Sequence, residues 1–190
     1  MVTKLYLGVL IGFFILVGAV FSSWAVDAPI PQSGQTIVYG TRDDGALHKG
    51  ILLPSSRFSD LGDGTVKDLL TNLIWMKNAN CWNSMTWFNA MGKVNSLNKG
   101  NVTCTGYSGH ATDWRLPSVN ELESLVDLGH FNPALPTGHL FVGAQADNYW
   151  SSTSNASFTS DAWVVYFNYG YVGFNEKPTT NYVWPVRGGQ

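Results

Sequence analysis

The sequence predicts an α+β domain in which short strands combine with two helices and long loops. Residues 161–174 read as two short strands joined by a turn at 168–170, as in a hairpin. Thr86 and Ser118 each precede apolar residues at helical spacing, so each is expected to cap a helix. Stretches rich in glycine and proline separate these segments and indicate turns.

The first 25 residues predict a signal peptide. Lys4 supplies a positive start, residues 5–21 form an apolar run, and the small residues Ser23 and Ala25 suit cleavage after Ala25. An uncleaved membrane anchor is the alternative, although the run is slightly short for a span of about 20 residues. We expect export to the periplasm, the cell surface or the medium, with no membrane contact after cleavage.

The composition fits an exported domain whose irregular loops are pinned by large side chains. Only 13% of the residues are charged, whereas 14% are aromatic, with 8 tryptophans. The formal net charge of -2 becomes more negative when Lys4 leaves with the signal peptide. This weakly acidic balance argues against general nucleic-acid binding, which needs a basic patch.

The two cysteines, Cys81 and Cys104, are expected to form one disulfide in an exported chain. In the chain-entropy model, closing a loop of this length stabilises the fold by about 3 kcal/mol. A redox pair is the alternative, but the CxxC spacing typical of such pairs is missing.

Residues 26–57 are expected to form an extended segment that lies against the main domain. Within it, 27–35 predict a proline-containing lead-in, 36–39 a short strand, 42–45 a turn and 50–54 a short apolar step.

The main domain, residues 58–190, is expected to open with a hairpin. Residues 58–60 and 65–68 flank a glycine turn, and 73–76 form the next short apolar strand. Further on, the sequence predicts a loop at 131–142, a strand at 149–153 that enters the core, and a last strand at 182–187, where Pro185 indicates an edge or a bulge.

Two helices are predicted from their caps. The first begins after Thr86 and ends before Gly100, with an inner face formed by Trp87, Met91, Val94 and Leu97. The second begins with a capping box of Ser118 and Glu121 and ends at Gly129, with an inner face formed by Val119, Leu122, Leu125 and Val126.

The hairpin of residues 161–174 presents two different faces. Because side chains alternate along a strand, Trp163, Val165 and Phe167 share one face, which we expect to be core. The other face is aromatic and polar without charge, which suits a contact surface. Its candidate ligand-binding residues are Val164, Tyr166, Asn168, Tyr169, Tyr171, Phe174 and Asn175. A hairpin buried on both faces is the alternative, because alternation alone does not separate core from contact surface.

Several motifs together resemble the Lcl C-terminal domain family over about residues 58–190. They are Gly62–Val66 with Leu73–Trp75, Asp113–Pro117 with Glu121–Leu122, Tyr149–Thr153, Ala162–Trp163 with Phe167, Gly170 and Val172, and Val186–Gly188. The resemblance implies a C-type-lectin-like fold with a twisted, mostly antiparallel sheet, two helices and long loops. Formylglycine-generating enzymes share that fold, so it does not fix the function. Many members carry a cysteine near the C-terminal strand, where this chain has Trp184, so Cys81 and Cys104 would close a different loop.

The C-terminal end is also similar to the variable region of proteins that diversity-generating retroelements rewrite. Residues 182–189 close an aromatic, asparagine-rich stretch. Adenine-directed mutagenesis of asparagine-type codons yields any residue except Lys, Glu, Gln, Met and Trp. The residues in this allowed set are Val164, Tyr166, Asn168, Tyr169, Tyr171, Gly173, Phe174 and Asn175, whereas Trp163 and Lys177 would be fixed. Many family members share this end without a retroelement, so both origins stay open.

The leading functional hypothesis is an exported binding module whose partner is a glycan or a protein. Loops and strand ends on a rigid frame carry recognition, and Tyr and Trp rings stack on sugars or anchor protein contacts. The alternative is a structural protein that forms homo-oligomers or fibres through residues 26–57.

No enzymatic activity is expected. A formylglycine-generating activity needs reactive thiols, which a disulfide removes. The histidines are scattered, and none stands in an HExxH motif or a triad-like setting; they are His48, His110, His130 and His139. The carboxylates that could form an acid/base pair are Asp113, Glu121, Glu123 and Asp127, but helix capping and solvation explain Glu121 and Glu123 more simply.

No cofactor or obligatory metal is expected either. Asp60 and Asp63 lie in a glycine turn, and this stretch lacks the alternating oxygen ligands and the final Glu of an EF-hand loop. The Glu-Pro-Asn loop of sugar-binding C-type lectins is also missing. Asp113 and Arg115 are expected to form a buried ion pair or to bind nearby backbone, and Arg187 to pair with a neighbouring carboxylate.

Overall fold

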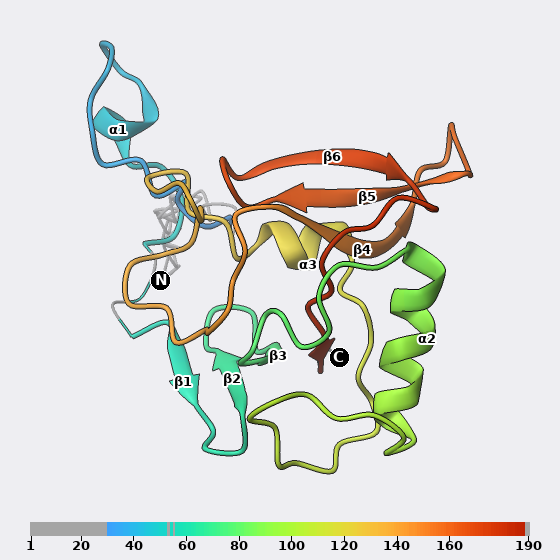
Figure 1. Ribbon diagram of the computed structural model, residues 1–190. Coiled ribbons are helices and arrows are strands. Elements are labelled where there is room, and N and C mark those ends of the chain that lie inside the picture. Colours follow the sequence, from blue (N-terminus) through green and yellow to red (C-terminus); the bar gives the residue numbers. More distant parts are fainter. Residues whose placement is uncertain (1–29, 53, 55, 189–190) are drawn as a thin grey trace, which may run out of the picture.

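The computed structural model describes residues 30–52, 54 and 56–188, which form an α+β fold with two antiparallel sheets (Figure 1). The predicted fold class is therefore confirmed. One sheet has the strand order β1-β2-β3-β7, and the other has the order β4-β5-β6. The signal peptide predicted for residues 1–25 lies outside the described residues.

The first sheet begins with the predicted hairpin and ends with the last strand of the chain. β1 (Phe58–Asp60) pairs with β2 (Thr65–Asp68), β2 with β3 (Ile74–Met76), and β3 with β7 (Val186–Arg187). In the turn between β1 and β2, Gly64 has a φ of 86° and packs against the backbone of Gly106, so only glycine fits there.

The two carboxylates of this turn hold the hairpin in shape. The Asp63 carboxylate accepts a hydrogen bond from the N–H of Thr65 at 3.0 Å. Asp60 accepts one from the N–H of Gly62 at 3.0 Å and forms a surface ion pair with Lys77 at 2.5 Å. The hydrogen bond from the Lys77 ammonium holds the pKa of Asp60 below its usual value.

The second sheet contains the predicted strand and hairpin of the C-terminal half. β4 (Asn148–Ser154) and β6 (Tyr171–Glu176) flank the central strand β5 (Asp161–Tyr166). Tyr182 pairs with the free edge of β4 at Tyr149 before the chain continues into β7. The segment 182–187 therefore joins the two sheets (Figure 1).

The first predicted helix is α2 (Trp87–Asn98), which lies beside the β4-β5-β6 sheet (Figure 1). The Thr86 side chain caps it by accepting a hydrogen bond from the N–H of Asn89 at 3.4 Å. Its buried residues are Ala90, Val94 and Leu97, whereas Met91 is exposed. The place predicted for Met91 on the inner face is wrong, because the buried stripe passes through position 90 instead.

The second predicted helix, α3 (Val119–Glu123), packs against the same sheet (Figure 1). Both halves of the capping box are present, since Ser118 and Glu121 each bond to the backbone of the other. The helix ends at Glu123 and not at Gly129, because the next N–H groups, of Leu125 and Val126, bond three residues back and tighten the chain.

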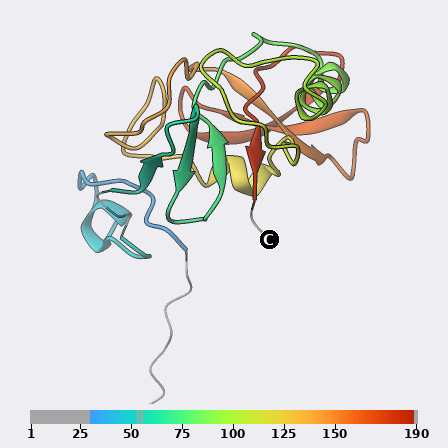
Figure 2. The same ribbon diagram turned by 90° about the horizontal axis from the view of Figure 1, so that it is seen from below.

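The N-terminal segment folds back on itself and projects from the body (Figures 1 and 2). It contains the short helix α1 (Asp44–Leu47), which Asp43 caps. The segment reaches the main domain at Ser33, whose carbonyl accepts a hydrogen bond from the N–H of Leu128 at 2.7 Å.

The strand predicted for residues 36–39 is wrong. The N–H of Tyr39 and the carbonyl of Ile37 bond to the side chains of Asp43 and Gln35 and not to a neighbouring strand. The three apolar side chains of this stretch are exposed, and they are Ile37, Val38 and Tyr39.

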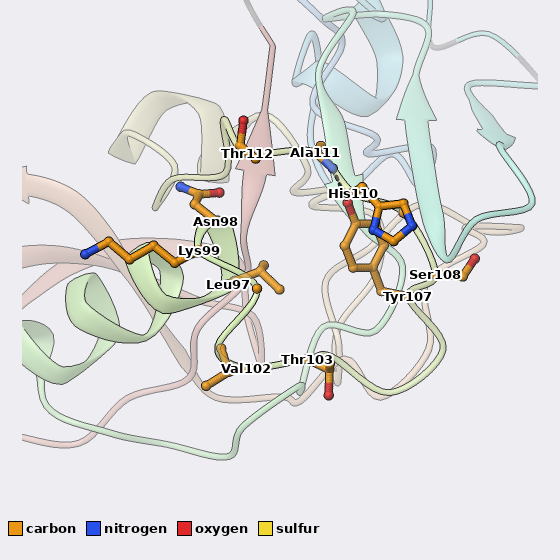
Figure 3. A pocket seen from close by; sticks show the side chains of 12 residues that line it. Leu97, Asn98, Lys99, Val102, Thr103, Tyr107, Ser108, His110, Ala111 and Thr112 are labelled. Atoms are coloured by element: carbon orange, nitrogen blue, oxygen red, sulfur yellow. Dashed lines mark hydrogen bonds between the residues drawn. The ribbon is translucent and has the colours of Figure 1, made fainter.

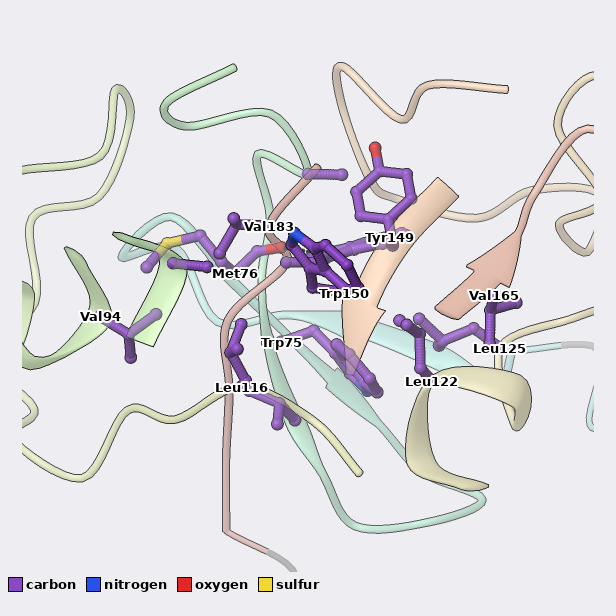
Figure 4. Close-up of a cluster of buried hydrophobic side chains, with 14 of the residues drawn as sticks. Trp75, Met76, Val94, Leu116, Leu122, Leu125, Tyr149, Trp150, Val165 and Val183 are labelled. Carbon is purple, nitrogen blue, oxygen red and sulfur yellow. Dashed lines mark hydrogen bonds between the residues drawn. The ribbon is translucent and has the colours of Figure 1, made fainter. Parts of the chain in front are cut away.

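The core lies between the two sheets and is rich in aromatic rings. Figure 4 shows Trp75, Tyr149 and Trp150 gathered in one interior, and all three are fully buried. Trp184 joins them with ring centroids 5.8 Å from Trp75 and 5.4 Å from Tyr149. Its indole N–H donates to the carbonyl of Met76 at 2.8 Å, so the ring is buried without losing its hydrogen bond.

A buried ion pair fixes the beginning of the main domain. The guanidinium of Arg57 donates to both carboxylate oxygens of Asp68, at 2.9 and 2.7 Å, and to the carbonyl of Ser124 at 2.7 Å. Arg57 thereby ties β2 to the end of α3.

Arg115 pairs with Glu121 and not with Asp113, so the ion-pair alternative is wrong; the backbone alternative holds for Arg115, whose guanidinium donates to the carbonyl of Gly188 at 3.0 Å. Two hydrogen bonds of 2.7 Å join the guanidinium to the Glu121 carboxylate. The capping box already places this carboxylate at the start of α3, within reach of Arg115. Arg187 lies over the ring of Trp114, with 5.5 Å between the guanidinium carbon and the ring centroid.

Candidate ligand-binding surface

The turn between β5 and β6 is held firmly by the loop 126–134. The N–H groups of Asn132 and Ala134 donate to the carbonyls of Asn168 and Phe167 at 2.8 and 2.6 Å. Gly170 has a φ of 79°, and a Cβ added to it would lie 2.6 Å from a methyl carbon of Val126. This part of the chain therefore requires glycine and presents its neighbours in a fixed position.

The strand register separates the side chains of the hairpin onto two faces. Tyr166 pairs with Tyr171 beside the turn, and Trp163 pairs with Phe174 further along. Paired residues in an antiparallel sheet share a face, so Phe174 lies on the face of Trp163, opposite to Tyr171. The expectation that Phe174 belongs to the same surface as Tyr171 is wrong, because three positions separate them on one strand.

The inner face agrees with the prediction at Val165 and Phe167, which are fully buried. Figure 4 shows Val165 beside Leu122, which belongs to the capped helix α3, and Leu125, which lies two residues beyond its end. Trp163, at the far end of the strand, is only partly buried. Its ring centroid lies 5.7 Å from that of Phe174.

Val164 is only 2% exposed, so its predicted place on the contact surface is wrong. It pairs with Trp150 on β4 and with Gly173 on β6. The Tyr171 ring and a Val164 methyl group lie 3.5 and 3.9 Å from the position of a Cβ on Gly173, so the ring closes over the gap left by the glycine. Asn175 is half-buried, and its amide donates to Asn181 at 3.2 Å.

The remaining predicted residues form one surface, which we call the tyrosine cluster: Tyr166, Asn168, Tyr169 and Tyr171. The ring centroid of Tyr166 lies 5.0 Å from Tyr171 and 5.8 Å from Tyr169. Tyr169 and Tyr171 are 62% and 54% exposed. The amide of Asn168 donates to the hydroxyl of Tyr166 at 3.2 Å, which fixes the central ring.

Sequence reasoning missed one neighbour of the tyrosine cluster, Asn148 on β4. The register places Asn148 opposite Tyr166, which itself lies opposite Tyr171, so the three side chains form one row across the sheet. Only the pairing of β4 with β5 reveals this row. It adds a second amide to an aromatic surface without a charged side chain.

The fold and the motifs in it correspond to a known family. Residues 64–187, from β2 to β7, match the Lcl C-terminal domain. The chain belongs to the Lcl C-terminal domain family. The resemblance drawn from the sequence motifs is thereby confirmed. A comparison with curated proteins finds no match to this chain.

In this Lcl C-terminal domain, a pocket of about 450 Å³ lies between the end of α2 and the loop 101–112 (Figure 3). Cys104 in this loop forms the predicted disulfide with Cys81, and their Cα atoms are 4.9 Å apart. Figure 3 shows Tyr107 and His110 on one side of the pocket and Lys99 on the other. None of the predicted binding residues lines this pocket.

Within the described part of the Lcl C-terminal domain and its N-terminal segment, no three His, Cys, Asp or Glu side chains gather as metal ligands do. Among the same residues, no helix has the length and apolar character that a membrane span requires.

Proposed function

We propose that this protein is an exported binding module that holds a glycan or a protein on the tyrosine cluster. The supporting observation is the row of Asn148, Tyr166 and Tyr171, flanked by Tyr169, on a hairpin whose opposite face is buried at Val165 and Phe167. Tyrosine rings offer a large contact area for little loss of side-chain entropy, and asparagine amides offer adaptable hydrogen bonds.

The chemistry of the tyrosine cluster sets how a partner would bind. Exposed rings stack on the apolar face of a sugar or on a protein side chain, and a contact with an aromatic ring of a protein partner adds about 0.5–1.5 kcal/mol beyond area burial. Because the tyrosine cluster has no charged side chain, we expect binding to depend weakly on salt.

A matched pair of double variants tests this proposal. Tyr166→Ala/Tyr171→Ala removes the central rings, whereas Phe158→Ala/Phe174→Ala removes two exposed rings from the other face of the hairpin, with centroids 6.4 Å apart. A glycan array and a pull-down from surface proteins should show binding by the wild type and by the phenylalanine variant only. Equal binding by the tyrosine variant, with an unchanged melting temperature, would refute the proposal.

Export needs a separate test, because the prediction of export rests on residues 1–25 alone. The protein recovered from the periplasm or the medium should begin at Val26 when its N-terminus is sequenced. A protein that keeps Met1 and sediments with membranes would instead support the uncleaved anchor.

A second candidate function is assembly through the N-terminal segment. Residues 30–52 expose several large apolar side chains, with Tyr39 80% and Leu52 75% exposed. Exposed apolar side chains grouped in this way are typical of protein contacts. Light scattering after size exclusion should show an oligomer that Val38→Asp/Tyr39→Asp dissociates. An unchanged mass would remove this candidate.

Diversification by a retroelement would add variety to the same binding function. Tyr166, Asn168, Tyr169 and Tyr171 belong to the set of residues that such a system can produce, and their side chains reach the surface. A reverse transcriptase gene next to a near-copy of the 3′ end of this gene would support diversification. Sequencing of the neighbouring DNA without such a copy would exclude it.

A further inference from the structure

Three side chains of the loop that supports the β5–β6 turn and of the segment that follows it lie in contact with one another as a series. Nε2 of His130 lies 2.8 Å from the hydroxyl oxygen of Thr137, and Nδ1 of the same ring lies 3.2 Å from a carboxylate oxygen of Asp127. The expectation that no histidine stands in a triad-like setting is therefore wrong for His130. The loop carrying the series closes on itself through the N–H of Asp127, which donates to the carbonyl of Ala134 at 3.1 Å.

The surroundings of the series give each member a distinct role. The Asp127 side chain is 8% exposed, and its carboxylate also accepts a hydrogen bond from the N–H of Gly129 at 2.8 Å. In the proposed site the Nδ1 atom of His130 faces this carboxylate, and Nε2 faces the hydroxyl of Thr137, whose proton it would accept. An acid, a histidine and a hydroxyl in this order are the parts of a nucleophilic triad.

The turn at Thr137 also supplies hydrogen-bond donors for an oxyanion. Among the described residues, none accepts a hydrogen bond from the backbone N–H of Thr137 or of Gly138. Gly138 has a φ of 76°, which turns the backbone sharply next to the hydroxyl. In acyl transfer, N–H groups beside the nucleophile donate hydrogen bonds to the negatively charged oxygen of the intermediate and thereby stabilise it.

We propose that Asp127, His130 and Thr137 form a hydrolytic site for small, uncharged carboxylic esters. Thr137 lies open to solvent, so a small ester reaches its hydroxyl without entering a cavity. Exposed apolar side chains of the same loop, those of Phe131 and Leu140, suit an uncharged substrate. This activity goes beyond ligand binding by the tyrosine cluster and does not depend on it.

The reaction has two steps. The Thr137 oxygen attacks the ester carbonyl carbon while His130 takes the hydroxyl proton; the carbon–oxygen bond to the alcohol breaks, and the alcohol leaves with that proton. Water then attacks the acyl-threonine, giving one proton to His130, which returns it to the Thr137 oxygen as the acid leaves. The sum is ester plus water giving acid plus alcohol.

Hydrolysis of p-nitrophenyl acetate by the purified full chain tests the site. Loss of the general base in His130→Gln should lower the rate about 100-fold or more. Thr137→Val should abolish it, and Thr137→Ser should keep it, because serine retains the hydroxyl. His110→Gln, which changes an exposed histidine on another loop, should react like the wild type.

Covalent labelling separates this site from incidental reactions of surface lysines. A fluorophosphonate probe should mark Thr137 in the wild type, as located by peptide mass spectrometry, and should mark nothing in Thr137→Val. Labelling at another residue, or hydrolysis by Thr137→Val at the wild-type rate, overturns the proposal. Melting temperatures equal to the wild type show that Thr137→Val and His130→Gln are folded.

Discussion

Replacing Arg57 by methionine should destabilise the fold by about 3–5 kcal/mol, because it leaves a buried charge without its partner. Arg57 and Asp68 are 3% and 0% exposed. Of the four hydrogen bonds that the Asp68 carboxylate accepts, Arg57 supplies two, at 2.9 and 2.7 Å, and the N–H of Leu70 and the hydroxyl of Thr71 supply the others, at 3.0 and 2.9 Å. Methionine fills much of the space but supplies neither charge nor donor.

The chain offers a matched control for this experiment. Lys77 and Asp60 form an ion pair whose side chains are 32% and 40% exposed, so Lys77→Met should cost about 0–1 kcal/mol. The double variant Arg57→Met/Asp68→Asn removes both charges and should be more stable than Arg57→Met alone.

Urea unfolding with the disulfide intact measures these differences in the free energy of unfolding. In thermal melts of the same variants, a loss of 1 kcal/mol should lower the melting temperature by about 2–4 °C in a domain of this size. If Arg57→Met and Lys77→Met lose the same free energy of unfolding, burial does not decide the strength of these pairs and the reasoning fails.

Three further predictions concern stability. Desolvation raises the pKa of Glu121, but hydrogen bonds from Arg115 and from the N-cap N–H outweigh it and hold the pKa below the ordinary 4.5. The ionised carboxylate therefore stabilises the fold above that pH, and the urea midpoint of the wild type should fall more steeply than that of Glu121→Gln as the pH drops from about 5 to 3. Replacing Cys81 and Cys104 by serine should lower the free energy of unfolding by about 3 kcal/mol, and a loss below about 1 kcal/mol would contradict the loop-entropy argument. Gly170→Ala should cost more than about 1 kcal/mol because alanine is strained at this positive φ, and a wild-type melting curve would show that the turn adapts.

Local chemistry explains which elements the sequence predicts correctly. The hydroxyls of Thr86 and Ser118 accept hydrogen bonds from N–H groups three residues ahead, so residues close together in the sequence determine where each helix begins. The turn at Gly170 and the disulfide between the only two cysteines could likewise be predicted from the sequence alone. The accessibility of Tyr169 and Tyr171 also followed, because a turn and the edge strand behind it lie at the surface.

Contacts between distant segments explain the errors. Val164 is buried because β4 and β6 flank it, and no pattern within β5 shows its neighbours. The buried Arg57–Asp68 pair joins residues on separate segments, and the same is true of the row that adds Asn148 to the tyrosine cluster. The position of His130 between Asp127 and Thr137 depends on a loop that folds back without regular structure, which periodicity does not describe.

The firmness of the β5–β6 turn bears directly on how strongly the tyrosine cluster can bind. Backbone hydrogen bonds from Asn132 and Ala134 hold the turn in one position before any partner arrives. The central ring of Tyr166 is fixed by Asn168, so binding has to order only the outer rings of Tyr169 and Tyr171. Each rotatable side chain immobilised in an interface costs about 0.5–1.5 kcal/mol, and these rings have few rotatable bonds. Most of the contact energy of this small surface is therefore available for affinity, which a flexible loop of the same composition would partly lose.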